Sequence, residues 1–116
     1  MTTIDTLLGL LRLEFNWDSY GALTVSPRAV CAALRFLARE LPAGAPLPSF
    51  VPTVDGGIQL EWHVGGIDIE LRFTEDSERV YAFYEHAVIG FEWESESEWI
   101  YSPRLGDALR SLVTAS

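Results

Sequence analysis

The sequence predicts a single α+β domain in which helices pack on one face of an antiparallel β-sheet. Apolar residues recur at helical spacing before residue 42, at a period of two from residue 50, and at helical spacing again after residue 103. No linker divides the 116 residues, so we expect one domain over 1–116 with the order α-α-β-β-β-β-β-α. Short turns favour an antiparallel meander of four to five strands, with the helices on one face.

Two helices are predicted in the N-terminal part of the chain. The first covers about 3–15, where apolar residues return every three to four positions. The second begins at Ser26-Pro27, an N-cap residue followed by proline at the first helical position, and ends at Leu41-Pro42. We expect Cys31 to be packed inside, in the middle of this apolar helix. The expected buried stripe consists of Val30, Leu34, Leu37 and Leu41.

Alternating apolar and polar residues predict the strands. A strand over 50–54 is assigned to a sheet edge, because Pro52 cannot donate a backbone hydrogen bond. Residues 58–64 and 67–73 alternate strictly around Gly65-Gly66, which signals a two-residue hairpin. Strands over 79–85 and 91–94 follow, and Ser102-Pro103 begins a last helix. Its expected inward residues are Leu105, Leu109, Leu112 and Val113.

The hairpin fixes which polar side chains face one another. With Gly65-Gly66 as the loop, the opposed pairs are His63 with Asp68, Glu61 with Glu70, and Gln59 with Arg72. All six lie on the face away from the apolar side chains. Directly opposed carboxylates are mildly destabilising. The groups that would offset this repulsion are Arg72 on a diagonal, a cation, or an arginine of a partner.

The charge balance favours some partners over others. Seventeen acidic residues stand against eight basic ones, all arginine, which gives a net charge of −9. Such a chain repels phosphate backbones, so direct nucleic-acid binding is not expected, whereas a basic protein surface is attracted. Solubility alone is the other reason for such a charge. The chain has one cysteine, no signal-peptide pattern and no apolar run long enough to span a bilayer, so we expect a cytoplasmic protein without membrane contact.

Two segments resemble a group of small uncharacterised bacterial proteins. Residues 16–22 read NWDSYGA, and residues 52–62 read PTVDGGIQLEW. They match a Trp-Asp-x-x-Gly-Ala loop and a Pro-Thr-x-Asp-Gly-Gly-Ile-x-Leu-Glu-Trp hairpin, separated by a helix that ends in Leu-Pro. The resemblance covers about 16–73. The group has no settled activity, so it implies no catalytic residue.

The leading hypothesis is a non-catalytic module that presents an acidic sheet face to a basic protein, as an antitoxin, immunity protein or inhibitor does. The alternative is a small enzyme or weak metal-binding protein that uses the carboxylates and histidine of the hairpin. No cofactor, dedicated metal site or catalytic residue is expected, because no nucleophile or phosphate-loop motif is present. A homodimer is possible, because the aromatic residues exceed what one small core hides. The expected partner-binding residues are Glu61, His63, Asp68, Glu70, Trp17 and Tyr20.

Overall fold

A computed structural model describes residues 24–74, 79–87, 90–98 and 103–115. The predicted helix over 3–15 and the loop that carries Trp17 and Tyr20 lie outside these ranges. The predicted combination of helices with an antiparallel sheet is confirmed. No helix in the described ranges is both long enough and apolar enough to cross a membrane.

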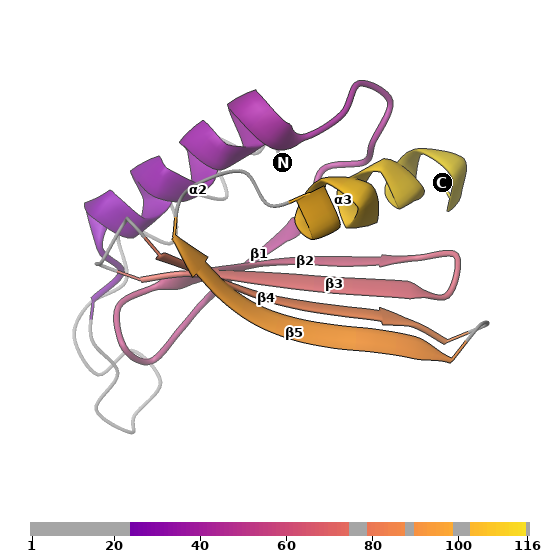
Figure 1. Cartoon of the computed structure of the whole chain (residues 1–116). Coiled ribbons are helices and arrows are strands. Elements are labelled where there is room, and N and C mark those ends of the chain that lie inside the picture. The colour runs from indigo at the N-terminus through magenta and orange to yellow at the C-terminus, as the bar shows by residue number, and fades with distance from the viewer. Residues whose placement is uncertain (1–23, 75–78, 88–89, 99–102, 116) are drawn as a thin grey trace.

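The sheet is an antiparallel meander in which neighbouring strands follow chain order (Figure 1). Its strands are β1 (Ser49–Pro52), β2 (Ile58–Val64), β3 (Ile67–Phe73), β4 (Arg79–His86) and β5 (Phe91–Glu98). The short strand β1 lies at one edge, as Pro52 predicts, and β5 lies at the other.

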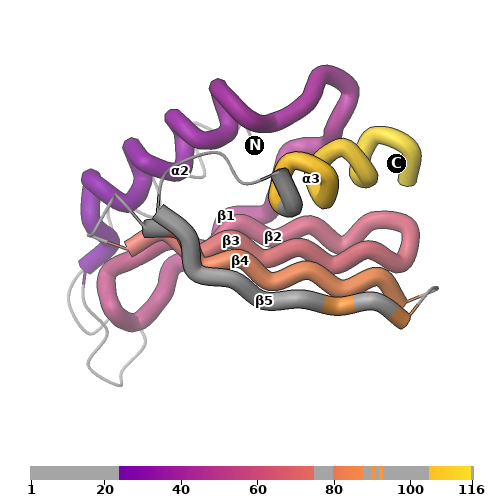
Figure 2. The backbone as a smooth tube through the Cα atoms, viewed as in Figure 1, coloured from indigo at the N-terminus to yellow at the C-terminus, as the bar shows by residue number. Residues whose placement is uncertain are grey.

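Both described helices lie on the same side of the sheet. Figure 1 and Figure 2 show α2 (Pro27–Glu40) and α3 (Pro103–Ala115) above the strands, and α2 contacts β2 and β3 while α3 contacts β3. The core therefore forms between these helices and one face of the sheet. No described element covers the opposite face.

Helix α2 begins and ends where the sequence predicts, but it buries a different face. The Ser26 side chain accepts a hydrogen bond from the Arg28 backbone N–H at 3.2 Å, and Pro27 occupies the first turn. The prediction that Leu34 is buried is wrong, because its side chain is 40% exposed. The prediction for Cys31 is also wrong, because this residue is exposed. The buried residues are Ala29, Val30, Ala32, Ala33 and Phe36.

Small side chains explain this orientation of α2. Alanines permit close approach of the helix to the sheet, and Phe36 fills the remaining space against Phe73, with ring centroids 5.6 Å apart. At 3.6 residues per turn, Cys31 lies roughly opposite this alanine face. In α3, Leu105, Leu109 and Leu112 are buried as expected. Ala108 is buried as well, whereas Val113, expected inward, is 37% exposed.

The hairpin of β2 and β3 has the predicted register. Val64 pairs with Ile67, and the polar pairs His63–Asp68, Glu61–Glu70 and Gln59–Arg72 follow. Ile58, Leu60 and Trp62 of β2 are buried beneath the helices. Trp62 also donates a hydrogen bond from Nε1 to the Pro46 carbonyl oxygen at 2.9 Å, which fastens the connector after α2 to the sheet.

The turn between β1 and β2 gives a structural reason for part of the Pro-Thr-x-Asp-Gly-Gly segment. The Gly57 backbone N–H donates to the Thr53 hydroxyl at 3.0 Å and to the Asp55 carboxylate at 3.3 Å. A Cβ atom at Gly57 would lie 2.4 Å from the Phe73 carbonyl oxygen, so no larger residue fits without a backbone shift. The Ser26 backbone N–H donates to the Gly56 carbonyl oxygen at 2.7 Å, which ties this turn to the start of α2.

Candidate functional site

The sheet face opposite the helices carries the candidate site. Polar residues alternate with the buried residues of β2 and β3, and the register continues them into β4 and β5. Asp68 pairs with Glu85, which in turn pairs with Glu92, while Glu61 pairs with Glu70. We call these five carboxylates, Glu61, Asp68, Glu70, Glu85 and Glu92, the acidic face.

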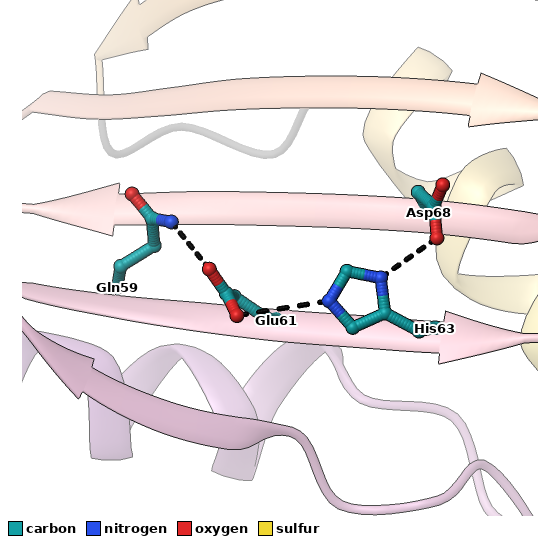
Figure 3. A network of polar contacts seen from close by, with 4 residues as sticks. All are labelled: Gln59, Glu61, His63 and Asp68. Atoms are coloured by element: carbon teal, nitrogen blue, oxygen red, sulfur yellow. Dashed lines mark hydrogen bonds and ion pairs between the residues drawn. The ribbon is translucent and has the colours of Figure 1, made fainter.

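A chain of polar contacts runs across one half of the acidic face. His63 Nδ1 lies 2.7 Å from Asp68 Oδ1, and His63 Nε2 lies 3.6 Å from Glu61 Oε2 (Figure 3). Gln59 donates from Nε2 to Glu61 Oε1 at 2.7 Å. Arg72 Nε and Nη2 both donate to Gln59 Oε1 at 3.3 Å. This network holds the two β2 side chains Glu61 and His63 in fixed positions.

The network raises the pKa of His63. The hydrogen bond to Asp68 is the largest cause, and attraction to Asp68 and Glu61 acts in the same direction, while desolvation partly opposes them. The His63 side chain is 57% exposed, so solvent weakens these attractions. Protonation of His63 would place a positive charge between two carboxylates of the acidic face.

Glu70 stands outside this network. Its register partner Glu61 is bound by Gln59 and His63, and Arg72 donates to Gln59 rather than to Glu70. Among the described residues, no hydrogen bond or ion pair reaches the half-buried Glu70 side chain. Of the three groups expected to offset the repulsion, Arg72 therefore does not do so. Glu70 is a carboxylate that remains available to a cation.

Two aromatic residues of β4 adjoin Glu70 on the same face. Phe83 is the register partner of Glu70, and Tyr81 is the partner of Arg72. Tyr81 is 41% exposed and Phe83 is half-buried, whereas Val80, Ala82 and Tyr84 point to the opposite side and are buried. The alternation of side-chain faces over 79–85 is visible in the sequence. It would have placed these aromatic residues beside Glu70 if the β3–β4 register had also been assigned.

Catalytic and metal roles receive little support from this geometry. His63 and Asp68 have the spacing of a base with its orienting carboxylate, but the pair lies on an open face that does not exclude water. Glu61, His63 and Glu70 do not form a ligand set: no cluster of three or more His, Cys, Asp or Glu side chains in the described ranges is placed to hold a metal ion.

A separate hollow lies at the β4–β5 turn. Its volume is about 340 Å³, and its lining includes Glu85, His86 and Glu92 but neither His63 nor Glu70. The Nδ1 atom of His86 is buried, and no hydrogen bond reaches it within the described part of the chain. His86 and Glu85 are consecutive in β4, so the register assigns them to opposite faces of the sheet.

The structure brings together three of the six residues predicted to bind a partner. Glu61, His63 and Asp68 form the network, and Glu70 lies beside it. The positions of Trp17 and Tyr20 lie outside the described residues. Sequence reasoning did not assign Tyr81, Phe83, Glu85 and Glu92 to this face.

Comparison with family models, with curated proteins and with solved structures found no match to this chain.

Proposed function

We propose that this protein is a non-catalytic binding module that engages a basic protein partner through the acidic face. The observation that carries the proposal is Glu70, a half-buried carboxylate that no cation of the described chain neutralises although it faces Glu61. A protein that needed the charge only for solubility would gain from spreading its carboxylates apart, because directly opposed like charges destabilise a sheet.

The arrangement of charge agrees with recognition by attraction. Carboxylates from β2, β3, β4 and β5 lie on one side of the molecule, and the described hydrogen bonds of Arg72 go to Gln59 rather than to any of them. A basic partner would be attracted at long range and held in register by several carboxylates at short range. Binding of this kind weakens as salt is added, because exposed charges are screened.

Matched variants test the proposal in the native host. The face variant Glu70→Gln/Glu85→Gln and the control variant Glu40→Gln/Asp107→Asn remove the same charge, the first from the acidic face and the second from the helices. We expect the wild-type and control proteins, used as bait, to capture the same basic protein, whose affinity falls at least tenfold for the face variant. The proposal fails if the face variant binds that protein as tightly as the control does, or if the captured protein is acidic.

A further inference from the structure

Two aromatic residues, Tyr81 and Phe83, lie among the carboxylates of the acidic face. Recognition by charge alone does not explain their position. Tyr81 and Phe83 lie on the face that no described element covers, so they add nothing to the core beneath the helices. Tyr81 is the one aromatic side chain among the exposed large hydrophobic residues of the described chain. An exposed aromatic ring beside carboxylates offers a second kind of contact to an incoming cation.

Both strands that neighbour this aromatic pair carry acidic residues at register positions beside it. In β3, Glu70 is the register partner of Phe83. In β5, the register partners of Phe83 and Tyr81 are positions 94 and 96, and both carry glutamate. Phe83 therefore lies in register between acidic positions on both neighbouring strands, whereas Tyr81 has an acidic position in β5 on one side and Arg72 in β3 on the other.

Arg72 leaves the rings accessible. Arg72 is the register partner of Tyr81, but both of its described hydrogen bonds go to Gln59 in β2, away from β4. Glu70 likewise has no described cation. A carboxylate and an aromatic surface are thus adjacent and both open to an incoming group.

We infer that the partner binds here through an arginine side chain that lies over Tyr81 and Phe83 and forms an ion pair with Glu70. A guanidinium group is planar, stacks on aromatic rings and binds a carboxylate through two parallel hydrogen bonds. A lysine ammonium is a strongly hydrated point charge that would bind Glu70 but would gain less from the rings. This inference rests on the proposed function and adds the chemistry of the partner's contact residue.

Two peptide probes test the arginine contact separately from the proposed binding of a basic protein. Fluorescent nona-arginine and nona-lysine peptides carry equal charge, and their dissociation constants are measured by anisotropy at low salt. We expect wild type to prefer nona-arginine by about two- to fivefold, the range that one or two exposed cation–π contacts provide. Tyr81→Leu and Phe83→Leu should bring this ratio close to one while nona-lysine binds as before. Glu70→Gln should weaken both peptides several-fold.

Controls make each outcome decisive. Val51→Ala removes exposed apolar surface from β1, away from the rings, and should leave the ratio unchanged. Circular dichroism establishes that each variant is folded, and Tyr81→Leu decides the matter if Phe83→Leu does not fold, because Tyr81 is more exposed.

Equal affinity for the two peptides, unaffected by the ring variants, would overturn the arginine inference but leave the proposed function standing. If Glu70→Gln and Glu85→Gln do not weaken the binding of the peptides, both the arginine inference and the proposed function are overturned. Arg35 is an exposed cation of α2 that could bind the acidic face of a second copy. If the protein self-associates and Arg35→Gln abolishes this, the partner is a second copy, and the inference of a different protein as partner is overturned.

Discussion

Replacing Glu70 with glutamine removes one negative charge with little change in side-chain size. We expect this substitution to stabilise the isolated protein and to weaken its binding to a basic partner. Opposed residues in an antiparallel pair have Cβ atoms about 5 Å apart, and two unit charges at that distance in water repel by about 0.8 kcal/mol. Screening by salt lowers this value to about half. We therefore expect Glu70→Gln to raise the free energy of unfolding by about 0.4–0.8 kcal/mol and the melting temperature by about 2–3 °C.

The assay is urea denaturation at about pH 8, where His63 carries least positive charge. Asp107→Asn is the matched control, since it removes one charge from α3 and breaks only the exposed ion pair with Arg110. This control should cost a few tenths of a kcal/mol or nothing. The reasoning is refuted if Glu70→Gln gives the same gain in a Glu61→Gln background, because the gain would then not arise from repulsion between the two carboxylates.

The remaining predictions concern pH, packing, thiol reactivity and assembly. Because the pKa of His63 is raised in the folded protein, its protonated form stabilises the fold below about pH 6.5, and this contribution is lost as pH rises through the folded-state pKa. The stability advantage of wild type over His63→Gln should therefore shrink between about pH 5.5 and about pH 8, whereas affinity for a basic partner should rise over the same range. Gly57→Ala should cost at least about 2 kcal/mol by thermal melting, because its Cβ would meet a backbone oxygen. At Gly44 an added Cβ has space, but φ is +88°, so Gly44→Ala should lower the free energy of unfolding by about 1 kcal/mol. An equal loss of stability in Gly44→Ala and Gly57→Ala would contradict the steric argument. Cys31 should react with a thiol reagent nearly as fast in native protein as in denaturant, and strong native protection would contradict its exposed position. We expect a homodimer, so light scattering should give twice the chain mass of 12.9 kDa. A mass of one chain at high protein concentration would reject this prediction.

The hairpin could be predicted residue by residue because two independent signals agree. Strict alternation sets the face of every side chain, and Gly65-Gly66 sets the loop length, so the pairing of Glu61 with Glu70 follows. The identity of hydrogen-bond partners does not follow from register. Arg72 binds Gln59 directly across the strands instead of a carboxylate on the diagonal.

The orientation of α2 could not be read from its large apolar residues. Spacing of Val30, Leu34 and Leu37 suggested one stripe, but the helix packs through its alanines, which allow the helix to lie closest to the sheet. Cys31 was misassigned for the same reason. Within the sheet, the candidate site was predicted only over β2 and β3, because the β3–β4 register depends on a turn with no two-residue signal.

Among the described residues, the arginines of α2 and the carboxylates of the acidic face lie on opposite sides of the sheet. Arg28, Arg35 and Arg39 are exposed on α2, on the opposite side of the sheet from Glu70 and Glu85. These described charges contribute a dipole component directed through the thickness of the sheet. The field of a basic partner exerts a torque on this dipole component, which turns the acidic face toward the partner before the surfaces touch. Fewer random collisions are then wasted in wrong orientations, and the association rate should fall steeply with ionic strength even where the final affinity depends mainly on short-range contacts.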